Sequence, residues 1–256
     1  LLLSPNNLLK PSDGGPVAVP SQDMVLGIYY LTQERPGAKG EGKFFKSVNE
    51  AILAYENGVI TLQSKIKVRV TKNVNGTDKT GVIESTLGRF IFNEILPQDL
   101  GFVDRSIPEN ELKLEVDFHV GKKGLKQILE KIINTHGATK TAEALDDIKS
   151  MGYKYSTKAA MTVSISDMTV PPEKPELIAK AQDTVDKITR NYKRGLITEE
   201  ERYKEVVETW KTTDDILTKA LLDGLDKYNN IYMMADSGAR GSDKQIKQLA
   251  GMRGLM

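Results

Sequence analysis

Residues 178–220 read IAKAQDTVDKITRNYKRGLITEEERYKEVVETWKTTDDILTKA, and their pattern decides the fold of the second half of the chain. Apolar positions recur at alternating spacings of three and four residues, the heptad pattern of two helices that pack along one seam. Gly195 can end the first helix, and Thr198 with Glu201 forms a capping box that begins the second. We predict a protruding antiparallel hairpin, about 30 Å long for roughly 20 residues per helix. The seam positions are Ile178, Ala181, Val185, Ile188, Tyr192, Tyr203, Val206, Trp210, Thr213, Leu217 and Ala220.

The charges at the tip of this hairpin have two interpretations. Lys193 and Arg194 end the first helix, and three glutamates begin the second at residues 199–201. Helix dipoles favour this arrangement, so a solvated hairpin explains the charges by itself. A long exposed hairpin is also suited to the docking of another helical hairpin. Nearer the other end, Asp214 and Asp215 point about 100° apart on a helix, so they cannot share a proton, and we expect both to face solvent.

The first half of the chain has a mixed α/β pattern. Residues 65–70 alternate basic and apolar side chains, as in a half-buried strand, and Asn75-Gly76 predicts a hairpin turn after it. Residues 112–118 alternate in the same way and predict another strand. Five helices are also expected. Three begin after the capping residues Ser21, Ser47 and Thr86. The other two span about residues 122–135 and 139–149 and are ended by Gly137 and Gly152. The predicted fold class is α+β, mostly helical.

The last part of the chain, residues 231–256, reads IYMMADSGARGSDKQIKQLAGMRGLM, and its basic residues outnumber its acids. Gly238 and Gly241 permit positive φ on either side of Arg240, and Ser242 can cap the following helix. Such a loop places backbone N–H groups and an arginine fork around one spot, which is the geometry that binds phosphate. The alternative is an ordinary glycine-rich loop that leads into a helix.

Composition excludes several classes of site. With 39% apolar and 28% charged residues and a net charge of +1, the chain has the composition of a globular protein. No stretch approaches the ~20 apolar residues that span a bilayer. The chain has no cysteine, and His119 and His136 are isolated, so we expect both histidines to be structural and predict no metal site and no catalytic residue.

The whole chain resembles the bacterial DNA-directed RNA polymerase β′ subunit. The strongest match is ADSGARGS at residues 235–242 followed by QIKQLAGMRGLM at 245–256, and SPNNLLKPSDGGPVAVPSQDMVLGIYYLT at 4–32 agrees at the other end. Three further segments match between them in the family's order: STLGRFIFNEILP at 85–97, SISDMTVPPEK at 164–174 and GLITEEERYKEVVETW at 195–210.

The resemblance implies four regions. They are a pore region over 1–135, a funnel region over 136–174, a rim-helix hairpin over 175–228, and a strand-loop-helix over 229–256 that leads toward the bridge helix. The implied function is to line the secondary channel, through which nucleotides enter and the RNA 3′ end backtracks, and to dock regulators. Implied partners are the other polymerase subunits (β, α, ω and the rest of β′), nucleoside triphosphates, the RNA 3′ end, template DNA, and Gre-type or DksA-type factors. The implied location is cytoplasmic, with no membrane partner.

The resemblance also implies site residues. Arg240 matches the family arginine that contacts the triphosphate, with Lys247 and Arg253 on the same surface. Lys247 stands where the family commonly carries arginine, so it keeps the charge but lacks the bidentate fork of a guanidinium. Regulators would dock at the tip, on Leu196, Thr198, Glu200, Glu201 and Lys204.

The family's magnesium loop, NADFDGD, does not occur in this sequence. We therefore expect an internal piece of a larger nucleotidyltransferase subunit, inactive by itself and without a cofactor, whose parent holds magnesium through ligands outside this chain. Two alternatives are a stand-alone nucleotide-phosphate-binding protein and a self-contained coiled-coil interaction module.

Overall fold

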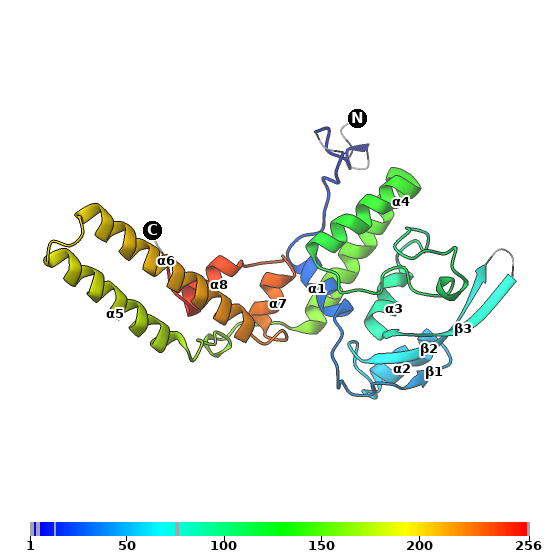
Figure 1. The fold of residues 1–256 in the computed structure, drawn as a ribbon. Helices are drawn as coiled ribbons and strands as arrows, with labels where there is room; N and C mark the ends of the chain where they lie inside the picture. Colours follow the sequence, from blue (N-terminus) through cyan, green and yellow to red (C-terminus); the bar gives the residue numbers. More distant parts are fainter. Residues whose placement is uncertain (1–2, 4–5, 13, 75–76, 255–256) are drawn as a thin grey trace. The chain divides into compact units, whose positions relative to one another are not determined.

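The structure is a computed structural model that describes residues 3, 6–12, 14–74 and 77–254. The chain divides into two compact units (Figure 1). The first unit comprises residues 1–161 with 237–239, and the second comprises 162–236 with 240–256. The four regions that the resemblance implies stay a prediction. Within the part of the chain that is described, no helix combines the length and the apolar character needed to cross a membrane.

The first unit combines helices with one small sheet, which confirms the predicted α+β, mostly helical class. Its helices are α1 (Asp23–Thr32), α2 (Val48–Glu56), α3 (Leu87–Glu94) and α4 (Lys122–Ala159), with a 3₁₀ turn at Pro108–Asn110. The strands β1 (Phe44–Phe45), β2 (Lys65–Val74) and β3 (Thr77–Thr86) lie in that order in the sheet. The first strand pairs parallel to β2, and β2 pairs antiparallel to β3.

The predicted β-hairpin is confirmed in the ladder of β2 and β3. Ile66 and Val68 are buried, whereas Lys67 and Arg69 are exposed, as the alternation predicts. Val68 lies opposite Ile83, so the buried faces of the two strands coincide. The predicted turn at Asn75-Gly76 lies outside the described residues.

Two of the predicted helix caps are confirmed. The Ser47 side chain accepts a hydrogen bond from the Glu50 amide at 3.2 Å, and Thr86 accepts one from the Arg89 amide at 3.3 Å. The cap at Ser21 is wrong by one residue, because α1 begins after Gln22 and has no side-chain cap.

The strand predicted over residues 112–118 is wrong, because two side-chain amides replace a neighbouring strand. The Asn93 side chain accepts a hydrogen bond from the Val116 amide at 2.9 Å and donates one to the Val116 carbonyl at 2.7 Å. The Gln98 side-chain oxygen accepts a hydrogen bond from the Glu115 amide at 3.3 Å. Glu115 is buried beside Val116 instead of facing solvent, and its carboxylate pairs with Arg105 at 2.8 Å. The segment is therefore held by side chains rather than by a ladder.

The two helices predicted after residue 122 form one helix, α4, with a kink. Gly137 has φ 76° and ψ −174°, so the predicted break lies at the right residue. Gly152 does not end the helix, which continues to Ala159. Instead it lies where α4 crosses α1, and a Cβ on Gly27 would lie 1.8 Å from the Gly152 carbonyl oxygen. Only glycine allows the two backbones to approach so closely.

The second unit contains the predicted helical hairpin. It consists of a 3₁₀ turn (Ile165–Asp167), α5 (Lys174–Lys193), α6 (Glu199–Gly224), α7 (Asn230–Asp236) and α8 (Asp243–Ala250) (Figure 1). Gly195 has φ 73° between α5 and α6, and Thr198 and Glu201 form the predicted capping box. A small apolar core of Leu221, Leu225, Ile246 and Ala250 joins α6 to α8.

The seam of the hairpin is only partly as predicted. Ala181, Ile188, Thr213 and Leu217 are buried, whereas Tyr203 is 66% exposed. Tyr203 lies in the second turn of α6, near the tip of the hairpin.

The strand expected near residue 229 is a helix, α7. Asn229 caps it by accepting a hydrogen bond from the Ile231 amide at 2.9 Å. The segment before the glycine loop is therefore helix-loop-helix.

Candidate functional site

The loop between α7 and α8 has the predicted conformation. Gly238 and Gly241 have φ values of 74° and 84°, which favour glycine. The Ser242 hydroxyl accepts a hydrogen bond from the Gln245 amide at 3.4 Å and so caps α8. The Arg240 amide donates to the Met234 carbonyl at 3.1 Å, which ties the loop back to α7. The backbone of the loop is thus fixed at both ends.

Arg240 borders an apolar groove of about 430 Å³ between α7 and α8. Met168, Ile231, Met234 and Leu249 form much of its lining. Among the described residues that line this groove, Arg240 is the one with a charged side chain. An anionic ligand would therefore meet a single guanidinium at the edge of an apolar surface.

The other two predicted phosphate contacts lie in a different groove, about 470 Å³ in volume, between α6 and α8. Lys247 and Arg253 line it together with Trp210 and Asp214. The expectation that Arg240, Lys247 and Arg253 share one surface is wrong, because the grooves lie along different sides of α8. Gln248 borders both.

Lys247 forms an ion pair with the Asp214 carboxylate, which sequence reasoning placed in solvent. The Asp214 side chain is only 14% exposed and that of Lys247 is 22% exposed. Trp210 and Asp214 are four residues apart on α6, so they lie on one face of the helix. That spacing places Asp214 beside Trp210, but no local signal indicates its pairing with Lys247 of α8. Trp210 accordingly lines this groove rather than the seam with α5.

All five predicted docking residues at the hairpin tip are exposed, and two of them, Thr198 and Glu201, also form the cap of α6. The Thr198 amide donates to the Glu201 carboxylate at 2.8 Å, and these bonds from Thr198 lower the pKa of Glu201 below its usual value. Thr198 and Glu201 therefore hold the start of α6. Leu196, which is 68% exposed, and the exposed Glu200 and Lys204 form the surface that a partner could contact.

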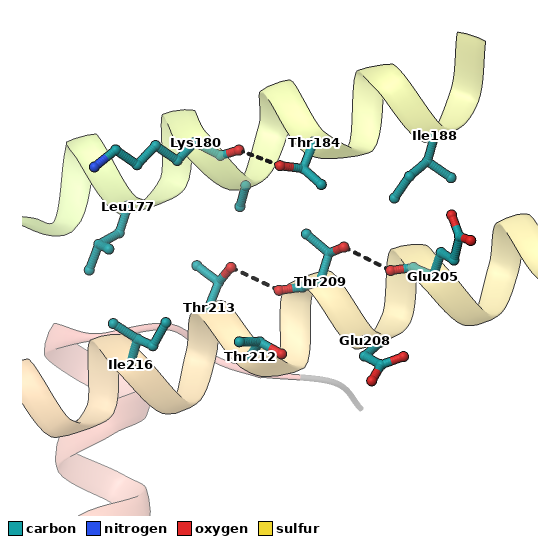
Figure 2. Close-up of a pocket in the computed structure, with 11 residues that line it drawn as sticks. Leu177, Lys180, Thr184, Ile188, Glu205, Glu208, Thr209, Thr212, Thr213 and Ile216 are labelled. Atoms are coloured by element: carbon teal, nitrogen blue, oxygen red, sulfur yellow. Dashed lines mark hydrogen bonds between the residues drawn. The ribbon is translucent and has the colours of Figure 1, made fainter. Parts of the chain in front are cut away.

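A shallow groove of about 580 Å³ runs between α5 and α6 (Figure 2). Figure 2 shows Leu177 and Ile188 of α5 directed toward α6, and Ile216 of α6 directed toward α5. Three threonine hydroxyls in the groove bond to carbonyls four residues earlier: Thr184 to Lys180 at 3.0 Å, Thr209 to Glu205 at 2.8 Å and Thr213 to Thr209 at 2.8 Å. These bonds satisfy the hydroxyls within their own helix, which leaves the groove largely apolar.

The described residues contain no group of three histidine or acidic side chains that could hold a metal ion. His119 instead bonds the Tyr29 carbonyl at 3.0 Å, and His136 contacts Asp99 at 2.6 Å. Both histidines therefore have partners within the first unit, as expected of structural residues.

Comparison with known families identifies the fold. The family model described as RNA polymerase Rpb1, domain 3, matches residues 7–168, and that of RNA polymerase Rpb1, domain 4, matches residues 197–256. The chain belongs to the RNA polymerase Rpb1 domain 3 family. The second match covers α6, the glycine loop and α8, so the groove between α6 and α8 lies within the Rpb1 domain 4 region. The groove beside Arg240 is also lined by Val163 and Met168, which belong to the domain 3 match.

Relatives named DNA-directed RNA polymerase subunit beta' match the chain over its whole length. The subunit of Lachnoclostridium phytofermentans is 75% identical, that of Acetivibrio thermocellus 59% and that of Clostridium acetobutylicum 58%. The chain spans 20% of the length of the first relative and 22% of the other two. The resemblance seen in the sequence is thereby confirmed.

Proposed function

We propose that this chain acts as part of the β′ subunit of a DNA-directed RNA polymerase, where it lines the secondary channel. Nucleoside triphosphates would enter through this channel, and the RNA 3′ end would backtrack into it. The observation that carries the proposal is the 75% identity to one β′ subunit over the whole chain. That match includes the hairpin, the glycine loop and both grooves.

Within this function, Arg240 would contact the triphosphate of the incoming nucleotide. Phosphoryl transfer depends on cationic groups that stabilise developing charge. The loop backbone supports this role, because it is fixed by the Ser242 cap and by the bond to Met234. Magnesium would be held by residues outside this chain, which by itself would be inactive.

The hairpin would serve as a docking post for Gre-type or DksA-type factors. Leu196 offers an apolar contact at the tip, with Glu200 and Lys204 beside it. The Thr198–Glu201 capping box would present these residues on a fixed helix end.

A chimeric enzyme tests the proposal. The matching segment of the Lachnoclostridium phytofermentans β′ subunit is replaced by this chain, and the polymerase is reconstituted with its β, α and ω subunits. We expect template-directed RNA synthesis within about twofold of the parent, since surface substitutions rarely perturb a fold. A matched chimera with the loop arginine replaced, Arg240→Ala, controls for assembly. An enzyme that assembles fully but makes no RNA would contradict the proposed function.

A further inference from the structure

We propose that the groove between α6 and α8 is a binding site for a single nucleoside triphosphate, separate from Arg240. The groove is lined by Trp210, Asp214, Lys244, Lys247 and Arg253. Its volume of about 470 Å³ is in the range of small-ligand sites. The proposal concerns the chain itself, so it does not depend on the polymerase function.

The groove combines an aromatic ring with cationic side chains. Nucleotide bases stack on aromatic side chains, and phosphates pair with lysine and arginine. Trp210 contributes the ring from α6, while Lys244 and Arg253 contribute exposed charges from α8 and the segment after it. Lys211 adds a further cation on the α6 side. One ligand could therefore meet the ring and the charges together.

Asp214 has an unsatisfied hydrogen-bond acceptor. One carboxylate oxygen pairs with Lys247, whereas the other, Oδ1, is buried and has no hydrogen-bond partner among the described residues. A buried acceptor without a donor is costly, and such groups often await a ligand or water. A simple phosphate has few donors to offer, but the amine of a base or a ribose hydroxyl can supply one. Asp214 therefore favours a nucleotide over a bare anion.

The ion pair between Lys247 and Asp214 determines where the positive charge of this groove lies. Asp214 neutralises Lys247, and the exposed Asp215 also lines the groove. The net attraction for phosphate therefore comes from Lys244, Arg253 and Lys211 at the exposed edge, whose three charges exceed the one of Asp215. The base would then lie inward against Trp210 and Asp214, with the phosphates outward. This orientation distinguishes the site from a surface patch that binds any polyanion.

Trp210 provides a direct probe, because it is the single tryptophan of the chain. The intrinsic fluorescence of the chain is measured while ATP is added without magnesium at low salt. We expect saturable quenching. The double variant Lys244→Gln with Arg253→Gln should weaken ATP binding at least about tenfold, since it removes two charge-assisted contacts.

A matched variant controls for total charge. Lys219→Gln with Lys227→Gln removes two exposed lysines that do not line the groove, and should leave ATP affinity within about twofold. All four residues are exposed, so circular dichroism should show unchanged folding. Absence of quenching, or equal weakening by both double variants, would overturn the proposal.

Two further ligands test the chemical class. Inorganic tripolyphosphate should compete weakly and should not reproduce the quenching, because it has no base. If it binds as tightly as ATP, the nucleotide assignment is wrong. A short single-stranded oligonucleotide that binds more tightly than ATP would equally refute a site for one nucleotide.

Discussion

Asp214 forms an ion pair with Lys247 and so changes the role expected of that lysine. The argument that adjacent aspartates point in different directions is correct, and Asp215 is exposed. It does not follow that both face solvent, because α8 covers the side of α6 that carries Asp214. A helix pattern gives the angle between two residues. It does not say which distant segment covers either of them.

Arg240 is the residue whose replacement should affect nucleotide use most directly. If Arg240 contacts the triphosphate as proposed, Arg240→Ala in the intact polymerase should raise the apparent KM for nucleotides, because the lost charge-assisted contact is worth about 1.5 to 3 kcal/mol. That loss corresponds to roughly a ten- to hundredfold effect. Single-nucleotide extension at varied substrate concentration measures it.

Arg240→Lys is the matched control. It restores the charge without the planar fork, so part of the effect should be recovered. An unchanged KM in Arg240→Ala would show that the arginine only supports the loop.

Glu201 gives a prediction for pH. Its hydrogen bonds from Thr198 lower its pKa in the folded chain, so the capping interaction is fully present above the unfolded value of about 4.3. The stabilisation is lost as the pH falls through the unfolded pKa and then the lower folded pKa. An NMR titration of the side-chain carboxyl carbons should give Glu201 a lower midpoint in the folded chain than in the urea-unfolded chain. Equal midpoints would contradict the capping role.

At the scale of elements, the sequence predicts best where a local pattern is sufficient. The hairpin of α5 and α6 follows from heptad spacing and from caps that its own residues provide. Residues 112–118 have strand alternation but no strand partner, because Asn93 and Gln98 occupy the backbone groups. The helix at residue 137 breaks as predicted, whereas Gly152 reflects a contact with α1. The pattern of a segment cannot reveal contacts made by distant residues.

The same distinction applies to the candidate site. The glycine loop and its Ser242 cap are local features, and both were predictable. The division of Arg240, Lys247 and Arg253 between two grooves depends on how α8 packs against α6 and α7. Basic residues that are close in sequence can therefore lie on different surfaces.

The hairpin tip can be altered without changing its cap. The variant Leu196→Ala, Glu200→Ala and Lys204→Ala retains Thr198 and Glu201, so stability should change by only a few tenths of a kcal/mol. Binding of a Gre-type factor to the intact polymerase should weaken at least about tenfold if the tip is the docking surface. Factor affinity and thermal midpoint are measured together.

The control variant is Thr198→Ala, which removes the cap but leaves the exposed side chains. It should lower stability by about 1 kcal/mol and affect factor binding less than the tip variant. A tip variant that binds the factor as tightly as the unmodified enzyme would leave the hairpin with a purely structural role.

At the scale of the whole molecule, the two units have cores of very different size. The core of the first unit includes residues from all four of its helices and from its sheet, whereas that of the second is a cluster of Leu221, Leu225, Ile246 and Ala250. Hydrophobic stabilisation grows with the apolar area that is buried. The second unit should therefore unfold first.

Trp210 lies in the second unit, so its fluorescence reports that unit alone. On heating the chain, we expect the fluorescence midpoint at least about 5 °C below the main circular dichroism transition, a difference that corresponds to about 1 kcal/mol in a small domain. Coincident transitions would show that the chain unfolds as one cooperative unit.

The close approach of α1 to α4 also determines which sequences can encode this fold. Alanine at residue 27 would place its methyl group 1.8 Å from a backbone oxygen that cannot move aside, so Gly27→Ala should cost about 3 kcal/mol or more. Gly224 has nothing within 4 Å, so Gly224→Ala should be tolerated in the same urea denaturation assay.

A saturation library extends this comparison. Selection for folded chains at residues 27 and 152 should return glycine alone. At Gly14 or Gly37, which have positive φ but open surroundings, asparagine and aspartate should also survive. Glycines that look identical in the sequence would thus differ in mutational tolerance. The positions that accept glycine alone would identify where two backbones are in close contact.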